Sequence, residues 1–260
     1  MPLAAFGLAI VFGLGEAESV ALLLMGMCPG GVTSTLFVYV CGANVTVSLV
    51  MTTLSTFAAL FMMPLLLFAY ARPPLTNSGD SKVSYVAIVV TLVIATVPAL
   101  IGWRIRAKYA AFGEKLEHIA TRLGFFLVVA TIVAIFAWPV SGGAAGVTLK
   151  AIIVMFLLSP VGFALGYFTA YFLVGLDASL ARTVSIETGI QQVGIAGAIA
   201  VNSFRGDQLQ KMLSMMAIFG LFTFLFGLLW ATILRACGPP PDEKSAKFEL
   251  PKVLGGGTKS

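Results

Sequence analysis

The sequence predicts an all-α membrane protein that crosses the bilayer several times. Of its 260 residues, 59% are hydrophobic and only 10% are charged. The mean hydropathy is +1.00, and 20 phenylalanines and 27 glycines add to the apolar character. A single soluble domain could not bury that much apolar surface, so the chain belongs in a lipid bilayer.

Apolar stretches of about 20 residues, long enough to cross a bilayer as helices, follow one another along the chain. They lie at roughly 46–70, 83–103, 123–140, 149–175, 183–203 and 211–236. Two more apolar segments precede them at roughly 1–12 and 17–41, and the second is interrupted by Pro29, Gly30 and Gly31. The pattern predicts about eight membrane segments and no soluble domain of any size.

The start of the chain, MPLAAFGLAIVFGLG, lacks the positively charged beginning of a signal peptide. Its first residues are typical of a helix interior. Either the first span starts abruptly, or the chain lacks the beginning of a longer protein.

The distribution of Lys and Arg predicts the orientation. Five basic residues follow the 83–103 segment, and four lie in the tail after residue 236: Arg104, Arg106, Lys108, Lys115, Arg122, Lys244, Lys247, Lys252 and Lys259. We expect both regions in the cytoplasm and the tail to be disordered. The net charge of +5 is then a topology signal, and a nucleic-acid site is disfavoured because the basic residues lack interleaved aromatic residues.

Neither the cysteines nor the glycosylation sequon indicates chemistry. Cys28, Cys41 and Cys237 have no metal-ligand or paired spacing. The sequon begins at Asn44, and the predicted topology places it in the cytoplasm, so we expect it to be unmodified.

Only one acidic residue is predicted inside a membrane span, and that residue is Glu187. The other acids are expected in loops or in the tail: Glu16, Glu18, Asp80, Glu114, Glu117, Asp177, Asp207, Asp242, Glu243 and Glu249. A charged side chain at the centre of a membrane helix costs about 2.5 to 3.5 kcal/mol, so it normally faces a partner or a water-filled cavity. The simple alternative is a carboxylate near a helix end that pairs with Arg182.

Two of the apolar segments carry signs of a broken helix. Gly189 with Gln191 and Gln192 supplies a flexible point and two amides, and Pro29 with two glycines interrupts the earlier segment. Interrupted spans in both halves of a chain are typical of a transporter site near the middle of the membrane.

Hydroxyl side chains cluster around the first interruption and on the following segment. They are Thr33, Ser34, Thr35, Ser48, Thr52, Thr53, Ser55 and Thr56. The spacing of four between Ser48 and Thr52 places both on one helix face. Hydroxyls, freed carbonyls and the Glu187 carboxylate suit a hard cation such as sodium, which would offset the buried charge. The alternative for each hydroxyl is helix packing by small polar side chains.

Four stretches resemble the bile acid:sodium symporter family, most closely its animal branch. They are CPGGVTS (Cys28 to Ser34), VSLVMTTLST (Val47 to Thr56), FMMPLLLF (Phe61 to Phe68) and SIETGIQQ (Ser185 to Gln192). The similarity runs in the same order from residue 1 to about residue 236. MPLAAFGLA resembles the middle of the family's third helix, which implies that the first two helices and part of the third are absent.

The resemblance implies an inverted-repeat symporter fold with two broken helices that cross each other. The breaks would lie at Pro29 to Gly31 and at Thr188 to Gln192. Residues 1–81 would form the first part of the core, 82–145 the remaining panel helices, 146–237 the second part of the core, and 238–260 a cytoplasmic tail.

The resemblance also implies two sodium sites. The first would use Ser34, Thr35, Ser48, Thr52 and Glu187. The second would use the side chains of Glu187 and Gln191 with the backbone carbonyls of Thr188 and Ile190. Thr35 and Gln192 stand where the family usually has asparagine, and a further glutamine of the second site would lie upstream of residue 1.

The implied function is sodium-coupled symport of bile acids or related amphipathic organic anions by alternating access, in the plasma membrane. Sodium would be the coupling ion, and the core would move against the panel.

A proton-coupled version stays open, because burial favours the neutral form of a carboxyl group. A non-transporting or fragmentary protein of the same fold, which could dimerise to cover its exposed surface, is the alternative. An intramembrane enzyme is disfavoured, because such chemistry normally needs paired acids, a serine with a base, or a metal cluster.

Overall fold

The computed structural model describes residues 1–70 and 147–237, together with the isolated positions 90, 93, 94, 97, 101 and 104. Apart from those positions, the segments predicted at 83–103 and 123–140 lie outside the described residues, as does the tail 238–260. The described residues form helices, and the only extended pairing among them is an isolated bridge between Gly30 and Gln191. For this part of the chain, the predicted all-α class is confirmed.

Each half of the molecule contains a helix, two short helices separated by a break, and a longer helix. The first half consists of α1 (Pro2–Phe12), α2 (Glu16–Met27), α3 (Val32–Cys41) and α4 (Val45–Tyr70). The second consists of α7 (Leu149–Phe168), which continues into a π-helical turn η1 (Thr169–Leu173), α8 (Ala178–Gly189), α9 (Val193–Ser203) and α10 (Gly206–Cys237).

Local sequence explains where several helices begin and end. The side chains of Thr148 and Asp177 cap α7 and α8 by accepting hydrogen bonds from the backbone N–H groups of Ala151 and Leu180. Gly42 ends α3 in the left-handed conformation, with φ of 70°. These signals mark the start of α7, the start of α8 and the turn between α3 and α4.

The helix α4 is bent within its length. Its parts Val45–Ala59 and Phe61–Tyr70 meet at 58°. Pro64 has no N–H to donate to the carbonyl four residues earlier, at the bend, so it explains the change of direction. The straight first part carries Ser48 and Thr52, and the bend therefore lies beyond the polar region of this helix.

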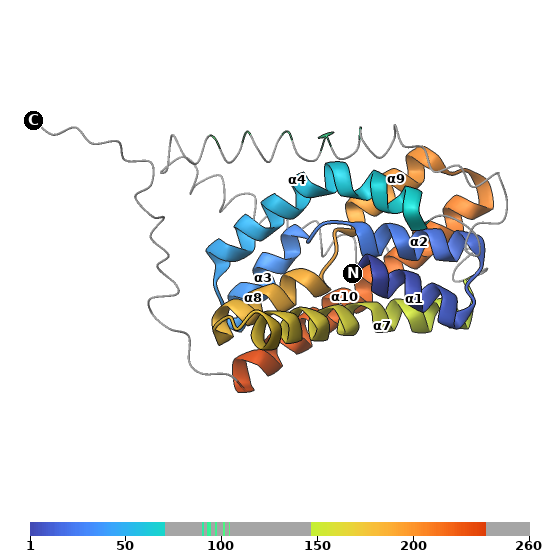
Figure 1. Cartoon of the computed structure of the whole chain (residues 1–260). Coiled ribbons are helices and arrows are strands. Elements are labelled where there is room, and N and C mark those ends of the chain that lie inside the picture. Colours follow the sequence, from blue (N-terminus) through green and yellow to red (C-terminus); the bar gives the residue numbers. More distant parts are fainter. Residues whose placement is uncertain are drawn as a thin grey trace, which may run out of the picture.

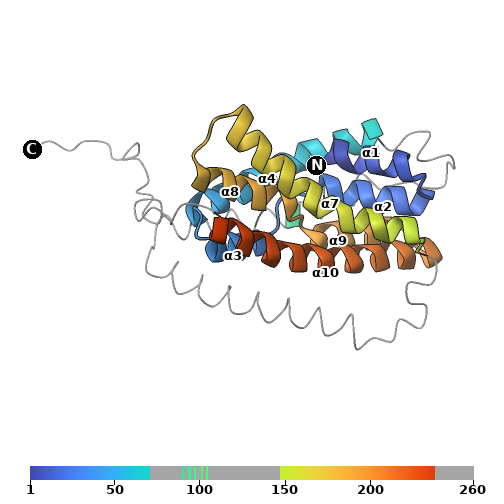
Figure 2. The same ribbon diagram turned by 90° about the horizontal axis from the view of Figure 1, so that it is seen from below.

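The two broken helices cross at the centre of the molecule. In Figures 1 and 2, α3 and α8 lie together in the left half, and α2 and α9 lie to the right of them. At the crossing, the backbone N–H of Gly31 donates to the carbonyl of Ile190 at 3.2 Å, and the N–H of Gln192 donates to the carbonyl of Pro29 at 3.1 Å. Each break thus satisfies backbone groups of the other.

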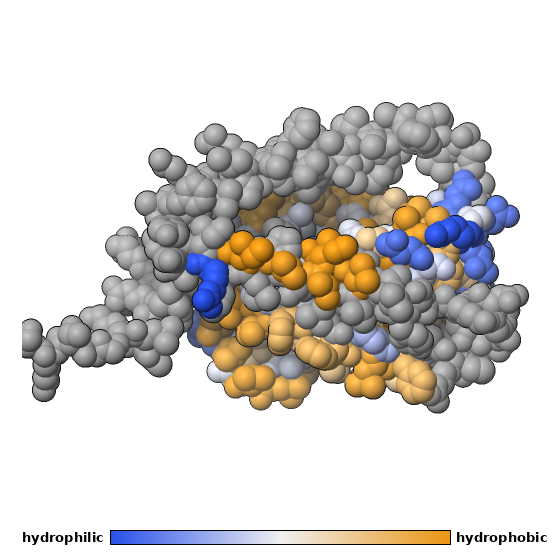
Figure 3. All heavy atoms as spheres, turned by 90° about the horizontal axis from the view of Figure 1, so that it is seen from above, coloured by the Kyte–Doolittle hydropathy of each residue, from blue (hydrophilic) through white to orange (hydrophobic). Residues whose placement is uncertain are grey.

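The core of the described structure surrounds α2. Every residue of α2 from Glu18 to Met27 is buried, and the helix contacts α1, α4, α7, α9 and α10. In contrast, α4 and η1 have outward apolar faces, where Leu54, Phe61 and Phe172 are each more than 60% exposed. On the face shown in Figure 3, apolar residues occupy the middle and hydrophilic residues gather at the two ends. This distribution suits a protein surrounded by lipid at its middle.

Two of the described helices are long and apolar enough to cross a membrane, at Leu149–Leu173 and Gly206–Ala236. The bent α4 would be a third. The 12-residue α2 is about 18 Å long, which is too short to cross the roughly 30 Å hydrocarbon core alone. It can cross only together with α3, as one broken span.

Three sequence-based expectations are wrong in detail. Glu16 and Glu18 were expected in a loop, but they lie in the first turn of α2, and Asp207 lies in the first turn of α10. Acidic residues are favourable there, because the N-terminal end of a helix carries partial positive charge. The second break is also narrower than predicted, because Thr188 and Gly189 are still helical.

Candidate cation site at the helix crossing

The carboxylate of Glu187 lies at the crossing. Glu187 is in the last turn of α8, three residues before the second break, and it is only 5% exposed. Its side chain points toward the first half of the molecule, where α3 begins and α4 passes. The neighbours from α3 and α4 therefore determine the environment of this carboxylate.

Three hydroxyl groups of the first half donate hydrogen bonds to Glu187. Ser34 Oγ donates to Oε1 at 2.6 Å, Ser48 Oγ also donates to Oε1, and Thr52 Oγ1 donates to Oε2 at 2.8 Å. None of these hydrogen bonds comes from Arg182, which was the simple alternative. Ser34 lies in the first turn of α3, so the positive end of that helix also faces the carboxylate.

A second layer of oxygen atoms surrounds the first. Thr35 Oγ1 lies 3.1 Å from Ser48 Oγ, and it can donate to Ser48 while Ser48 donates to Glu187. Ser34 Oγ lies 2.5 Å from the carbonyl of Gly31 as well as near Glu187, although a serine has one proton to donate. Ser34 therefore has two neighbouring acceptors for its single proton, and oxygen lone pairs outnumber protons around its hydroxyl.

The two halves of the molecule approach each other closely at Gly30. A Cβ atom there would lie 2.7 Å from Glu187 Oε2, too close for any side chain without a shift. At Gly189 a Cβ atom would lie 2.1 Å from Phe163 Cδ1. Neither glycine has a positive φ. Close packing therefore accounts for both glycines, whereas the sequence interpretation treated them as points of backbone flexibility in broken helices.

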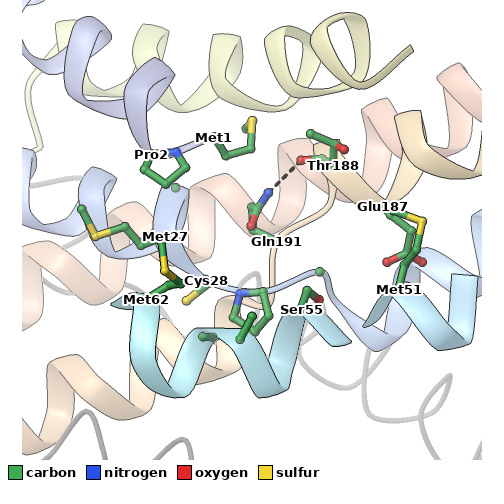
Figure 4. Close-up of a pocket in the computed structure, with 15 residues that line it drawn as sticks. Met1, Pro2, Met27, Cys28, Met51, Ser55, Met62, Glu187, Thr188 and Gln191 are labelled. Atoms are coloured by element: carbon green, nitrogen blue, oxygen red, sulfur yellow. Dashed lines mark hydrogen bonds between the residues drawn. The ribbon is translucent and has the colours of Figure 1, made fainter. Parts of the chain in front are cut away.

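The residues predicted for a second cation site lie at the end of α8 and in the second break that follows it. Gln191 Nε2 donates to the carbonyl of Thr188 at 2.8 Å, and the carbonyl of Ile190 accepts from Gly31. Glu187, Thr188 and Gln191 line a cavity of about 290 Å³, which Pro29 and Gly30 also border (Figure 4). Gln192 is half-buried and contributes its backbone N–H to the crossing.

No described cationic side chain forms an ion pair with Glu187; the ion pair found in this part of the chain joins Lys211 to Glu18. Hydroxyls can satisfy the hydrogen-bonding capacity of a carboxylate, but they leave its negative charge in place. Carboxylate, hydroxyl and carbonyl oxygens are the ligands that hard cations prefer. In residues 1–70 and 147–237, no three His, Cys, Asp or Glu side chains gather, so the donors at Glu187 are mostly neutral oxygens.

A second buried glutamate was missed by the sequence interpretation. Glu18 is 1% exposed and accepts hydrogen bonds from Gly15 N at 3.1 Å, Thr148 N at 3.0 Å and Thr148 Oγ1 at 3.2 Å. Lys211 Nζ lies 3.3 Å from it. This Glu18 cluster joins the starts of α2, α7 and α10. The available signal was the position of Glu18, three residues after a glycine that precedes an apolar run, which is typical of a helix cap.

The sequon asparagine is also part of the packing between the two halves. Asn44 is 7% exposed, its backbone N–H donates to Thr183 Oγ1 at 3.1 Å, and its Oδ1 accepts from Val47 N at 3.0 Å. Asn44 therefore takes part in the contact between α8 and the start of α4.

Comparison with known proteins links the chain to transporters. The sequence model of the Sodium Bile acid symporter family matches residues 1–142. The chain is 36% identical over 238 residues to the sodium-dependent organic anion transporter of Rattus norvegicus, an alignment that covers 91% of this chain and 62% of that protein. It is 32% identical over 256 residues to the hepatic sodium/bile acid cotransporter of Rattus norvegicus, covering 96% and 69%.

A human relative extends the same similarity. The hepatic sodium/bile acid cotransporter of Homo sapiens is 31% identical over 271 residues, with 99% of this chain and 76% of that protein covered. The chain thus spans less than two thirds of the length of the organic anion transporter and about three quarters of the human cotransporter.

Proposed function

The chain belongs to the sodium bile acid symporter family, a family of transporters and not of enzymes, and we propose that it is a sodium-coupled symporter of amphipathic organic anions. It is an integral, multi-pass membrane protein. The observation that carries the proposal is the Glu187 carboxylate, which is buried among hydroxyls of the other half and forms no ion pair with a described cationic side chain.

The first sodium site would use Glu187 with Ser34, Thr35, Ser48 and Thr52. The residues fit sodium because they supply a single negative charge and several neutral oxygens. With the cation bound, each hydroxyl could turn its proton away and direct a lone pair inward. Thr35 keeps an oxygen at the position where the family usually has asparagine, and its contact with Ser48 supports a role for it in this layer.

The second sodium site would use Glu187 and Gln191 with the carbonyls of Thr188 and Ile190. The cavity supports this assignment, because Glu187, Thr188 and Gln191 line it and an ion in the cavity could reach them. The carbonyl of Ile190 already accepts one hydrogen bond from Gly31, which leaves one lone pair for a cation. A cation bound here would therefore share the Ile190 carbonyl with the hydrogen bond that joins the two breaks.

We infer that the two halves are inverted repeats that form a core, and that residues 82–145 contribute to a panel against which the core moves. The repeated order of helix, broken pair and long helix supports this inference. Sodium bound at Glu187 would join α3, α4 and α8 and so favour one arrangement of the core. If that arrangement binds the organic anion better, the anion must raise sodium affinity by the same factor.

The proposed substrates are bile acids, steroid conjugates or related organic anions, because the relatives are named as transporters of organic anions and bile acids. A plasma-membrane location with a cytoplasmic C-terminus follows from the resemblance to the animal branch and from the basic residues of the tail.

Uptake measurements test the proposal directly. Cells that express the chain would be given a labelled bile acid and a labelled steroid sulfate, with sodium outside or with choline in its place. We expect uptake that requires sodium and that is lost in Glu187→Gln at equal surface level. A pH-driven uptake that ignores sodium would instead indicate proton coupling.

Two outcomes would contradict parts of the proposal. Sodium-dependent uptake that survives Glu187→Gln would remove the site assignment. Sodium-induced thermal stabilisation without uptake of either compound would favour the non-transporting alternative, a sodium-binding membrane protein of the same fold.

A further inference from the structure

The face of α8 opposite to Glu187 is held by a separate network. Ser185 precedes Glu187 by two residues, and successive helical residues are about 100° apart, so the two side chains leave the helix on nearly opposite sides. Ser185 is fully buried. The residues around Ser185 therefore hold the face of α8 that points away from Glu187.

A chain of hydrogen bonds connects three helices through Ser185. The indole Nε1 of Trp230, on α10, donates to Ser185 Oγ at 2.9 Å. Ser185 Oγ in turn donates to the backbone carbonyl of Phe163, on α7, at 2.7 Å. Since a hydroxyl has one proton, the indole N–H is the donor that fills its accepting side.

Aromatic packing follows the same path. The ring of Trp230 stacks on that of Phe163, with the ring centres 6.0 Å apart and an angle of 18° between the planes. Phe163 in turn lies directly against Gly189, the last residue of α8. Trp230 therefore contacts α8 before the break through Ser185 and supports its end through Phe163.

One turn earlier, α10 also approaches the crossing. A Cβ atom at Gly227 would lie 3.2 Å from Phe37 Cε2 on α3 and 3.3 Å from Ile190 Cδ1 in the second break. The segment from Gly227 to Trp230 thus touches α8, the break after it and the helix that carries Ser34. This segment therefore contacts α3, α8 and the second break, which are among the parts of the chain that meet near Glu187.

Small movements of α8 would matter at the carboxylate. The surface of a helix lies about 5 to 6 Å from its axis, so a rotation of about 10° moves a side-chain oxygen by about 1 Å. The hydrogen bonds from Ser34 and Thr52 measure 2.6 and 2.8 Å, and a shift of that size would break either of them. The rotation of α8 is therefore a sensitive variable of the site.

We propose that Trp230 is a positioning residue that fixes the rotation of α8 through Ser185 and Phe163 and thereby sets the affinity of the crossing for its cation. Trp230 forms no hydrogen bond with Glu187 and acts through the helix. The inference rests on the proposed function, since it requires that a cation such as sodium binds at Glu187.

The test uses the purified full chain in detergent. Its melting temperature is measured while sodium chloride replaces choline chloride at constant ionic strength, which gives a baseline stability and a half-saturating sodium concentration. The variants are Trp230→Phe, which keeps a ring but removes the N–H, Ser185→Ala, and the double variant. Thr232→Val is the matched control, because Thr232 is exposed and its hydroxyl bonds only to the Leu228 carbonyl of its own helix.

In Trp230→Phe we expect the half-saturating sodium concentration to rise about fivefold, the order expected for loss of one hydrogen bond of typical strength. Ser185→Ala should produce a similar rise, and the double variant should exceed the larger single effect very little, because both remove the same interaction. Thr232→Val should behave as wild type. If Trp230→Phe does not fold, Ser185→Ala tests the same hydrogen bond from its other end.

A lower baseline melting temperature in Trp230→Phe with an unchanged half-saturating sodium concentration would overturn the inference and make the role purely structural. Additive effects in the double variant would overturn it as well. If wild type itself shows no response to sodium, the proposed function fails and this inference fails with it, so the two failures are distinguishable.

Discussion

The described part of the molecule buries two glutamates, and they have opposite electrostatic solutions. Glu18 is 1% exposed and has backbone N–H groups and the ammonium of Lys211 as partners. Glu187 is 5% exposed, and its partners among the described residues are hydroxyl groups. The charge of Glu18 is paired with that of Lys211, whereas no described cationic side chain pairs with Glu187. A buried carboxylate that pairs with a cationic side chain holds parts of the fold together. A buried carboxylate without such a pair is suited to bind an ion from solution.

The largest expected effect is that of Glu187→Gln. The amide keeps the size of the side chain and can still accept hydrogen bonds, but it has no charge to attract sodium. We expect loss of sodium-dependent uptake and of stabilisation by sodium, measured as the melting temperature in sodium relative to choline. A sodium response of normal size would contradict the proposed difference between the two glutamates.

Gly30→Ala should be the next largest. The added methyl group would lie 2.7 Å from Glu187 Oε2, so the carboxylate or the first break must move. We expect the half-saturating sodium concentration to rise roughly tenfold, equivalent to about 1.4 kcal/mol. Gly7→Ala is the control, because a methyl group there meets nothing within 4 Å; it should leave the sodium response as in wild type.

Glu18→Gln sharpens the comparison, because its effect should be on stability alone. The substitution removes the charge that Lys211 pairs with and weakens hydrogen bonds between α2 and Thr148. We expect a loss of about 2 kcal/mol, the range for hydrogen bonds to charged groups. Thermal unfolding in choline would show the loss, and the half-saturating sodium concentration should be unchanged. A large change in that concentration would mean that Glu18 also takes part in cation binding.

Thr52→Val should give the smallest effect. It removes one of the hydroxyl oxygens at Glu187 while Ser34 and Ser48 remain. We expect the half-saturating sodium concentration to rise about three- to fivefold. Thr53→Val is the matched control, because its hydroxyl bonds only to the Leu49 carbonyl of the same helix. Equal effects of the two substitutions would show that Thr52 acts through helix stability and not at the site.

Much of this arrangement could be predicted from residue type and spacing. A lone acid in an apolar segment indicated Glu187, the spacing of four indicated the shared face of Ser48 and Thr52, and Pro29 with its glycines indicated the first break. These signals are local, because each depends on neighbours in the sequence or on the cost of burying a charge.

What the sequence did not indicate depends on partners far along the chain. Glu18 was assigned to a loop because its partners Thr148 and Lys211 are more than a hundred residues away. Trp230 had no visible role because Ser185 and Phe163 come together with it only in the folded molecule. The extent of the second break was overestimated because Gly189 serves packing against Phe163, which a sequence cannot distinguish from flexibility.

The reciprocal hydrogen bonds between the two breaks have a consequence for how such a protein can evolve. They join Gly31 to Ile190 and Gln192 to Pro29 through main-chain atoms, so no donor or acceptor of that joint is encoded by a side chain. Except at the closely packed glycines, mutation at the crossing can therefore change side chains without removing these backbone hydrogen bonds. Side chains such as those of Thr35 and Gln192 can thus change during evolution around a durable main-chain junction.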